Sequence, residues 1–257
     1  MGKKGRVEIG TSGYQYDHWR GVFYPEDIPK RKWFEYYATR FDTVEINNTF
    51  YRLPSAETFE QWHDRAPENF CFTLKYSRYG SHIKHLKDGA ETISAYMHAA
   101  QRLESKLGPI LVQLPPHWKV DPQRLDEFFS AARNHARWKR EGLRWDSHAQ
   151  RWAVEFRDPS WLEDRVYDVL ERRGVALCIH DIIKDHPRVV TADWVYLRLH
   201  GASDWGNYSP GDLDKMAGEI GAWRARGLDV YAYFNNDAHG YAVANAKDLE
   251  RRVHAAA

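Results

Sequence analysis

Charged and hydrogen-bonding side chains recur on one face of several short apolar runs. In YLRLHG, residues 196–201, the two-residue period of a strand turns Arg198 and His200 to one side and Leu197 and Leu199 to the other. Other runs alternate in the same way, with polar positions at Glu45, Asn47, Thr73, Lys75, Gln113, Glu155, Arg157, His180, Tyr233 and Asn235. Strands buried on both faces are usually apolar throughout, so this pattern indicates a polar interior.

The residue types on this face suit acid–base chemistry. Glu45 and Glu155 are candidates for a general acid and base, provided that their surroundings separate their pKa values. Lys75 offers a point charge or an amine nucleophile, and His200 a proton shuttle. The predicted catalytic residues are therefore Glu45, Lys75, Glu155 and His200.

Substrate binding is assigned to side chains that hydrogen-bond an anion or stack on a ring. Arg157 and Arg198 can form forked contacts with carboxylate or phosphate oxygens. The predicted binding residues are Ser12, Tyr14, Asn47, His82, Arg157, Trp161, Arg198, Asn235 and Asn236. An aromatic rim for a sugar or base face is predicted at Tyr14, Tyr16, Trp19, Tyr24, Trp161 and Trp205. Core packing is the competing explanation for each ring.

A self-satisfied ion-pair network is the alternative to an active site. The charges expected to share the interior are Glu8, Glu45, Lys75, Glu155, Arg157 and Arg198. Their near balance of sign is what a stable interior requires. Arg198, the deeper residue of its strand, fits such pairing best, whereas His200 lies nearer the strand end, where barrel active sites form.

No cofactor is predicted, although a divalent metal is an alternative that stays open. Its candidate ligands are Glu155, Asp181 and His200, at the ends of successive predicted strands. No HxH or HExxH spacing supports that site, and no dinucleotide or P-loop fingerprint follows a strand. His82 and His85 could share one helical face, with a solvated helix start as the alternative.

The amino-acid composition limits the classes of binding partner that are expected. The 37 Lys plus Arg nearly cancel the 36 Asp plus Glu, so the formal charge of +1 gives no overall attraction to nucleic acid or membrane. Cys71 and Cys178 sit in apolar runs and are predicted to be buried thiols. No segment resembles a signal peptide or a bilayer span, so a cytoplasmic location is expected.

Nucleic-acid binding or processing, as in an endonuclease, is a second functional hypothesis. Basic residues interleave with tryptophans and could hold a backbone and stack bases. These residues are Lys30, Arg31, Lys32, Arg133, Arg137, Trp138, Lys139, Arg140, Arg144, Trp145 and Arg151. Acidic residues are interspersed, which favours a solvated helix face instead. A noncatalytic ligand-binding barrel is the third hypothesis.

Short β-rich runs alternate with longer amphipathic ones. Strands are predicted at 7–12, 43–47, 71–76, 109–114, 152–157, 175–180, 194–200 and 229–235. Helices are predicted at 31–41, 57–66, 86–107, 122–141, 162–173, 211–226 and 241–254, with only a turn in 181–193. Asp121 before Pro122 predicts a helix start, and Gly108, Gly174 and Gly227 predict helix ends. The pattern predicts an α/β fold, a TIM (β/α)₈ barrel in one domain over 1–257, with an open doubly wound sheet as the alternative.

Seven sequence blocks resemble the signatures of the DUF72, or YecE-like, family, in family order. They are GTSGYQYDHWRGVFYP (10–25), FDTVEINNTFYRLP (41–54), FTLKYSRYGSH (72–82), LVQLPP (111–116), EFRDPSW (155–161), RLHG (198–201) and YFNNDAHGYAVANA (233–246). The chain departs from the family at Tyr14, where tryptophan is common, at Asn47–Thr49, where NST is usual, and at Asp158, where a basic residue is frequent. The resemblance implies a TIM barrel and brings no established reaction with it.

These inferences combine into one expectation. The chain is expected to act on a small polar or anionic, sugar- or phosphate-like substrate at the C-terminal mouth of its barrel. Hydrolase, isomerase and lyase chemistry stay open, and so does the oligomeric state. The expected partner is a small molecule rather than nucleic acid or a membrane.

Overall fold

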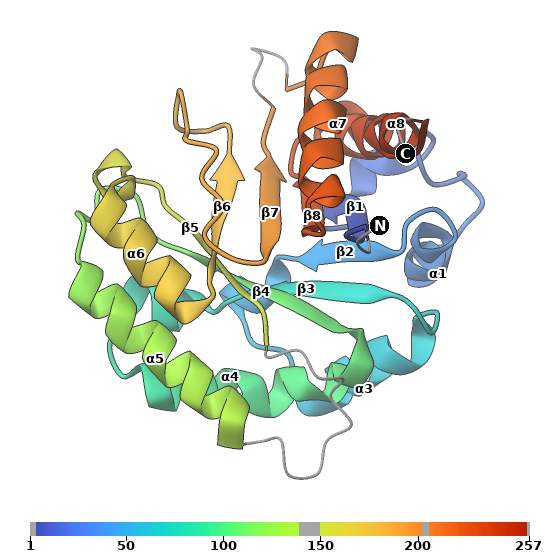
Figure 1. Cartoon of the computed structure of the whole chain (residues 1–257). Helices are drawn as coiled ribbons and strands as arrows, with labels where there is room; N and C mark the ends of the chain where they lie inside the picture. The colour runs from blue at the N-terminus through green and yellow to red at the C-terminus, as the bar shows by residue number, and fades with distance from the viewer. Residues whose placement is uncertain (1–3, 139–149, 202–205, 256–257) are drawn as a thin grey trace. The chain divides into compact units, whose positions relative to one another are not determined.

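The strands of the protein form a closed parallel barrel. A computed structural model of the chain describes residues 4–138, 150–201 and 206–255 (Figure 1). Within these residues the strands follow one another around the barrel in chain order, β1 to β8. The predicted TIM-barrel fold is confirmed.

The strands lie where the apolar alternating runs predicted them. They are β1 (Val7–Ser12), β2 (Thr43–Ile46), β3 (Cys71–Lys75), β4 (Leu107–Gln113), β5 (Trp152–Glu155), β6 (Ala176–His180), β7 (Trp194–Leu199) and β8 (Asp229–Phe234). All residues of β2, β5, β6 and β7 are buried, including the charged ones. The polar positions of these strands therefore lie inside the protein, as the alternation indicated.

Helices connect most of the strands. The α-helices are α1 (Trp33–Ala38), α2 (Asn48–Tyr51), α3 (Ala56–Arg65), α4 (Gly89–Ala100), α5 (Pro122–Trp138), α6 (Asp164–Arg173), α7 (Pro210–Ala225) and α8 (Tyr241–Ala255). Shorter turns are η1 (Asp17–Trp19), η2 (Lys30–Lys32), the π-helical η3 (Tyr79–Ile83), η4 (Gln101–Lys106), η5 (Pro159–Trp161) and η6 (Ala238–Gly240). The segment 181–193 holds no helix, as predicted.

Two predicted helices were too long at both ends. The helix predicted over 31–41 is α1, which runs from Trp33 to Ala38 after the 3-10 turn η2. The pattern predicted a helix over 86–107, but α4 begins at Gly89 and ends at Ala100, and the 3-10 turn η4 follows it. Glu104 leaves the helical region with φ 47° and ψ −125°. Gly108 does not end a helix, because it lies inside β4, where an added Cβ would approach the Cys71 Sγ to 2.4 Å.

Other predicted helix ends are confirmed by their hydrogen bonds. The Asp121 carboxylate accepts the backbone N–H of Arg124 at 3.0 Å, so it caps α5 before Pro122. Gly174 ends α6 with φ 67°, a left-handed conformation that glycine adopts without strain. Gly227 follows α7 with φ 83°.

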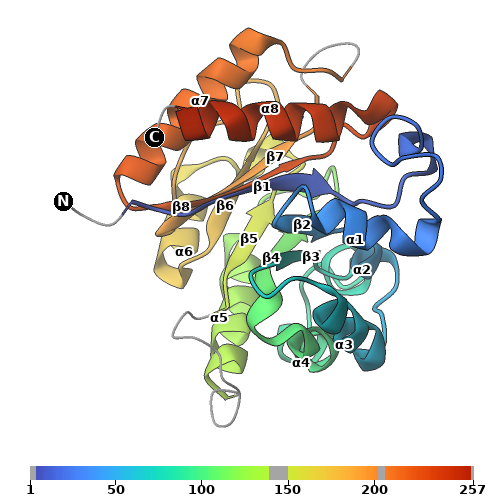
Figure 2. The same cartoon turned by 90° about the vertical axis from the view of Figure 1, so that its right-hand side faces the viewer.

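The chain divides into two compact units, which are described separately. Unit 1 comprises Met1–Glu45, Ile179–His186 and Asp193–Ala257. In it α8 lies along β1 and packs against α7 (Figure 2). Unit 2 comprises Ile46–Cys178 and Pro187–Ala192, and its helix α5 lies between α4 and α6 (Figure 1). The expectation of one domain over 1–257 stays a prediction.

Two expectations drawn from composition can be compared with the structure. Both cysteines are free thiols, Cys178 buried and Cys71 half-buried. Among the described residues, no helix combines the length and the apolar character needed to cross a bilayer.

Candidate functional site

A buried carboxylate, Glu45 on β2, organises the polar interior of unit 1. Arg198 on β7 donates from Nε to both carboxylate oxygens, at 2.9 and 3.0 Å, and from Nη2 to Oε1 at 2.7 Å. Tyr196 donates to Oε2 at 2.5 Å, and Ser12 donates to Oε1. The Glu45 and Arg198 side chains are 0% and 1% exposed. The predicted residues Ser12, Glu45 and Arg198 thus form one closed network.

Strand register explains why these side chains meet. Ser12 and Glu45 are paired across β1 and β2, and Arg198 is paired with Tyr233 across β7 and β8. The Tyr233 hydroxyl in turn lies 2.7 Å from the Thr43 hydroxyl. Burial raises the pKa of Tyr196 well above its usual value, and the charge of Glu45 adds to this. Tyr196 therefore stays protonated and remains a donor. The positive charge of Arg198 compensates the negative charge of Glu45. A catalytic role for Glu45 stays a prediction.

His200 lies just beyond β7, in a second hydrogen-bonded group of unit 1. Its backbone N–H donates to Asp181 Oδ1 at 2.9 Å, and Asp181 also accepts the Tyr208 hydroxyl. The Asn235 Nδ2 lies 3.0 Å from the His200 Nδ1. Because an amide nitrogen can only donate, Nδ1 is the acceptor in this contact. The predicted pair His200 and Asn235 is thus brought together, with an oriented imidazole.

Other histidines in unit 1 adjoin His200. The His180 ring lies 6.2 Å from the His200 ring and 4.4 Å from the His186 ring, between centroids. The strand alternation had indicated His180, but His186 lies in an irregular segment, where no periodicity marks it. Sequence reasoning therefore missed this imidazole group.

The proposed metal ligands are not gathered into one set. Among the described residues, no three or more His, Cys, Asp or Glu side chains are arranged to hold a metal ion. Asp181 instead binds the His200 backbone and Tyr208 in unit 1, whereas Glu155 belongs to unit 2. A divalent metal stays an untested alternative.

In unit 2, Glu155 at the end of β5 pairs with Arg157. The Arg157 Nε donates to Glu155, and its Nη2 donates to the Gln113 Oε1 at 3.3 Å. The Glu155 side chain is 0% exposed, whereas that of Arg157 is 21% exposed. The pair thus extends from the interior toward solvent, and the guanidinium retains an accessible edge.

A group of basic residues surrounds His82 in the same unit. The Lys75 Nζ lies 4.2 Å from the centroid of the Phe50 ring, and the His82 ring meets Phe50 edge-on at 4.9 Å. Burial and four basic residues together lower the pKa of His82 to about 4, with burial the largest cause; the four residues are Lys75, Arg78, His85 and Arg157. We call Lys75, Arg78, His82, His85 and Arg157 the basic cluster.

The basic cluster corrects one expectation. His82 and His85 do not share a helical face, because His82 lies in the π-helical turn η3 and His85 follows it with φ 49°. The turn is tied by the Ser81 hydroxyl, which donates to the Ser77 carbonyl at 2.8 Å and lies 3.0 Å from the His82 Nδ1. Such π-helical turns are rare and are frequent at functional sites. Sequence periodicity gives no signal for one.

Most rings of the predicted aromatic rim are packed in the core. Trp161 is 1% exposed and stacks on Phe156 at 4.9 Å, and Tyr14 is 8% exposed and packs on Phe34 at 5.4 Å. Trp19 and Tyr24 are also buried, Tyr16 is half-buried, and Trp205 lies outside the described residues. These contacts favour the packing explanation, and ligand stacking by Tyr14 and Trp161 stays a prediction.

Two other predicted binding residues and Asp158 have local partners. Asn236 is 5% exposed and donates to the carbonyl of Gly206 at 2.6 Å. Asn47 precedes α2, and its carbonyl accepts the N–H of Phe50. Asp158 caps η5 by accepting the Ser160 N–H at 3.0 Å, and Lys119 lies 3.1 Å from its carboxylate. Its negative charge is therefore already paired.

Three of the basic residues considered for nucleic-acid binding contact an acidic side chain or a carbonyl group. The Lys30 Nζ lies 2.7 Å from the Asp17 carboxylate, and the Lys32 Nζ lies 3.8 Å from that of Glu35. Arg133 donates to the carbonyl of Arg172 at 3.3 Å. Lys139, Arg140, Arg144 and Trp145 lie outside the described residues.

Comparison with known proteins identifies the family of this chain. The family profile described as "Protein of unknown function DUF72" matches residues 8–257. The UPF0759 protein YunF of Bacillus subtilis is 23% identical, over 95% of this chain and 93% of its own. The UPF0759 protein YecE of Escherichia coli K12 is 30% identical over 32% of this chain and 30% of its own.

Solved structures agree with the fold. A DUF72 family protein from Thermotoga maritima MSB8 superposes with a TM-score of 0.81 and 27% identity, covering 97% of this chain and 99% of that one. A DUF72 family protein from Enterococcus faecalis V583 gives a TM-score of 0.73 at 20% identity, over 96% and 95% of the chains. At that identity the second likeness bears on the fold alone. The predicted family resemblance is confirmed.

Proposed function

This chain belongs to the DUF72 family, whose description assigns no reaction, and from its basic cluster we propose an enzyme that binds a small anionic substrate. The substrate class is a carboxylate or a phosphate, as in a sugar phosphate. The proposed reaction is acid–base chemistry at the C-terminal ends of β3 and β5. Hydrolysis, isomerisation and elimination all need such proton transfer, and the proposal covers these three reaction classes.

The observation that carries the proposal is the concentration of positive charge around a neutral imidazole. The pKa of His82 is held at about 4, first by burial and then by Lys75, Arg78, His85 and Arg157. Lys75, Arg78, His85 and Arg157 all act on His82 with positive charge, and a bound anion would relieve that field. Perturbed titrating groups next to charged partners are typical of functional sites.

Three residues of the cluster, together with Glu155, then have distinct roles. Lys75 and Arg157 bind the anion, Arg157 through the edge that Glu155 and Gln113 leave accessible. Glu155 orients Arg157. His82 transfers the proton, because a bound anion offsets the neighbouring cations and raises the pKa of the imidazole toward its ordinary value of 6.5. Substrate binding therefore makes His82 a stronger base.

Catalytic roles for Glu45 and His200 are a separate proposal for unit 1. A cytoplasmic location and a small-molecule partner are proposed for the chain as a whole. The paired basic residues of unit 1 give nucleic acid no comparable site among the described residues. A noncatalytic barrel would bind the same anion without proton transfer, and the experiment below separates the two.

The first test is the pKa of His82, measured by NMR with inorganic phosphate as the probe. Phosphate should raise this pKa by about one unit, while sodium chloride of equal ionic strength should leave it nearly unchanged. His82→Gln assigns the resonance, and His98→Gln, which removes an exposed histidine of α4, is the matched control. An equal response to phosphate and chloride would overturn the anion site.

The second test is proton transfer itself. Small sugar phosphates and hydroxy acids are incubated with the protein in deuterium oxide, and deuterium incorporation or product formation is followed by NMR. The enzyme proposal expects turnover of at least one compound, with a loss of about 10²- to 10⁴-fold in His82→Gln and none in His98→Gln. Phosphate binding without any turnover would favour the noncatalytic barrel.

A further inference from the structure

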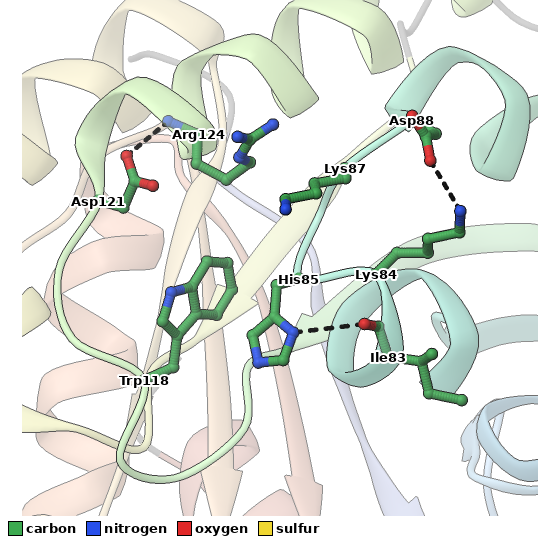
Figure 3. Close-up of a pocket in the computed structure, with 8 residues that line it drawn as sticks. All are labelled: Ile83, Lys84, His85, Lys87, Asp88, Trp118, Asp121 and Arg124. Carbon is green, nitrogen blue, oxygen red and sulfur yellow. Dashed lines mark hydrogen bonds and ion pairs between the residues drawn. The ribbon is translucent and has the colours of Figure 1, made fainter.

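A pocket of about 630 Å³ lies in unit 2, beside the segment that joins η3 to α4. Its other wall is the loop after β4 and the first turn of α5 (Figure 3). The residues that line it are Ile83, Lys84, His85, Lys87, Asp88, Trp118, Asp121 and Arg124. Its volume is in the range that holds a small metabolite.

The backbone around this pocket is held in an unusual conformation. His85, Leu86 and Asp88 have φ of 49°, 60° and 54°, and His117 beside Trp118 has φ of 64°. Left-handed conformations cost free energy in residues other than glycine and cluster at functional sites. Leu86 is 2% exposed, so core packing fixes this segment on the protein.

Trp118 provides an aromatic wall. Its ring meets the His85 ring edge-on at 4.9 Å and the Trp161 ring edge-on at 5.2 Å. The Trp161 Nε1 donates to the carbonyl of Trp118 at 2.6 Å, which fixes the backbone of the loop. Trp118 itself is half-buried and faces the pocket (Figure 3). Edge-on neighbours hold the indole in place, which suits it to stack on a planar ring.

Two cationic side chains point into the space above this wall. Figure 3 shows Lys87 and Arg124 extending toward each other from opposite sides of the pocket. The acidic residues of the lining have partners within it: Asp88 pairs with Lys84 at 2.9 Å, and Asp121 accepts the backbone N–H of Arg124. Arg124 also lies 3.3 Å from Glu127, one turn along α5, outside the lining. The pocket thus joins an aromatic wall to a positively charged rim.

We propose that this pocket binds a small molecule in which a planar ring is joined to an anionic group, such as a nucleoside monophosphate. The ring stacks on Trp118, and the anionic oxygens bind Lys87 and Arg124. The pocket shares only His85 with the basic cluster, so this inference does not depend on the proposed reaction. It assigns a second ligand site to unit 2.

Binding of adenosine monophosphate, adenosine and inorganic phosphate, measured by calorimetry, tests the site. The nucleotide should bind saturably, and adenosine and phosphate should each bind about tenfold or more weakly, because each makes only one kind of contact. Lys87→Gln should weaken nucleotide binding by about tenfold and leave adenosine binding unchanged. Lys215→Gln, which neutralises an exposed lysine of α7, should change neither.

The aromatic contact needs its own variant. Trp118→Leu should weaken the nucleotide and adenosine alike by about tenfold, and its circular dichroism spectrum must match that of the parent. If this variant fails to fold, the binding measured with Lys87→Gln decides, because Lys87 is exposed and its substitution should leave the fold intact. The inference is overturned if the nucleotide does not bind saturably at millimolar concentration. Equal affinity for phosphate and the nucleotide, or no effect of Lys87→Gln, would also overturn it.

Discussion

Arg198 and Glu45 form a two-point ion pair in which neither side chain reaches solvent. Nε and Nη2 of the guanidinium bind the carboxylate at distances of 2.7 to 3.0 Å, and Ser12 and Tyr196 bind the remaining acceptor positions. Arg198 Nη2 also donates to the Ser12 hydroxyl at 3.0 Å. Every charge in this group is therefore compensated within unit 1, and the pair acts first on stability.

Arg198→Met should destabilise the protein strongly. The substitution leaves the Glu45 carboxylate buried without its cation, which costs about 3 to 5 kcal/mol of unfolding free energy. Urea unfolding followed by circular dichroism measures this directly. Arg226→Met, which removes an exposed arginine after α7, is the matched control and should change the free energy of unfolding by less than about 0.5 kcal/mol.

A double variant separates the ion pair from simple packing. Glu45→Gln combined with Arg198→Met removes both charges, so it should recover part of the stability lost in Arg198→Met. If the double variant is less stable than the parent by the full sum of the two single losses, the two side chains act independently and their pairing is unimportant.

The part of this site that follows strand periodicity could be predicted from the sequence. Glu45, Glu155 and Arg198 lie on strands whose two-residue alternation marks the polar face, and all three side chains are buried. Which partner each one takes depends on register, and the sequence leaves that open. Arg198 was expected to pair with a glutamate, and register selects Glu45.

The remainder of the site depends on irregular backbone. His82 lies in a π-helical turn, and Leu86 and Asp88 adopt left-handed conformations without being glycine. Tertiary packing selects these conformations against the local backbone preference, so neither residue propensity nor residue spacing predicts them. His186 and Trp118 likewise lie outside any periodic segment. The polar strands could therefore be identified from the sequence, whereas most of the loops that complete the sites could not.

His200 should occupy the tautomer with its proton on Nε2, because Asn235 donates to Nδ1. Asn235→Asp replaces that donor with an acceptor, so Nδ1 should then carry the proton. Nitrogen-15 NMR of labelled histidine distinguishes the two tautomers by chemical shift, and His200→Gln assigns the signal. The prediction is wrong if the wild-type ring is protonated at Nδ1, or if Asn235→Asp leaves the tautomer unchanged.

Lys106 should contribute to stability as a cap of α3. Its side chain is 8% exposed, and Nζ donates to the carbonyls of His63 at 2.5 Å and Ala66 at 2.7 Å. Lys106→Met fills the same space without a donor, and should cost about 1 to 3 kcal/mol of unfolding free energy. Urea unfolding of this variant is compared with that of Lys215→Met, whose lysine is exposed. Equal stability of the two variants would contradict the capping role.

Glu8 should make the protein less stable as the pH rises from about 4.5 to 7. Burial raises its pKa from an ordinary 4.5 to about 7, and Asp42, Asp229 and Glu250 add to the rise against the opposing charge of Arg6. Between these values the unfolded chain loses the proton of Glu8 while the folded protein keeps it. The contribution of Glu8 to stability is therefore full below pH 4.5, falls by about 2 to 3 kcal/mol up to pH 7, and is constant above it.

Glu8→Gln tests this dependence, because the amide resembles the protonated acid and does not titrate. The free energy of unfolding is measured with urea at pH 5 and at pH 8. At pH 5 the variant and the parent should differ little. At pH 8 the variant should be more stable by about 2 to 3 kcal/mol. Glu171→Gln, which replaces an exposed glutamate of α6, should give the same small difference at both pH values. A gain from Glu8→Gln that does not grow between pH 5 and pH 8 would show that Glu8 ionises normally in the folded protein.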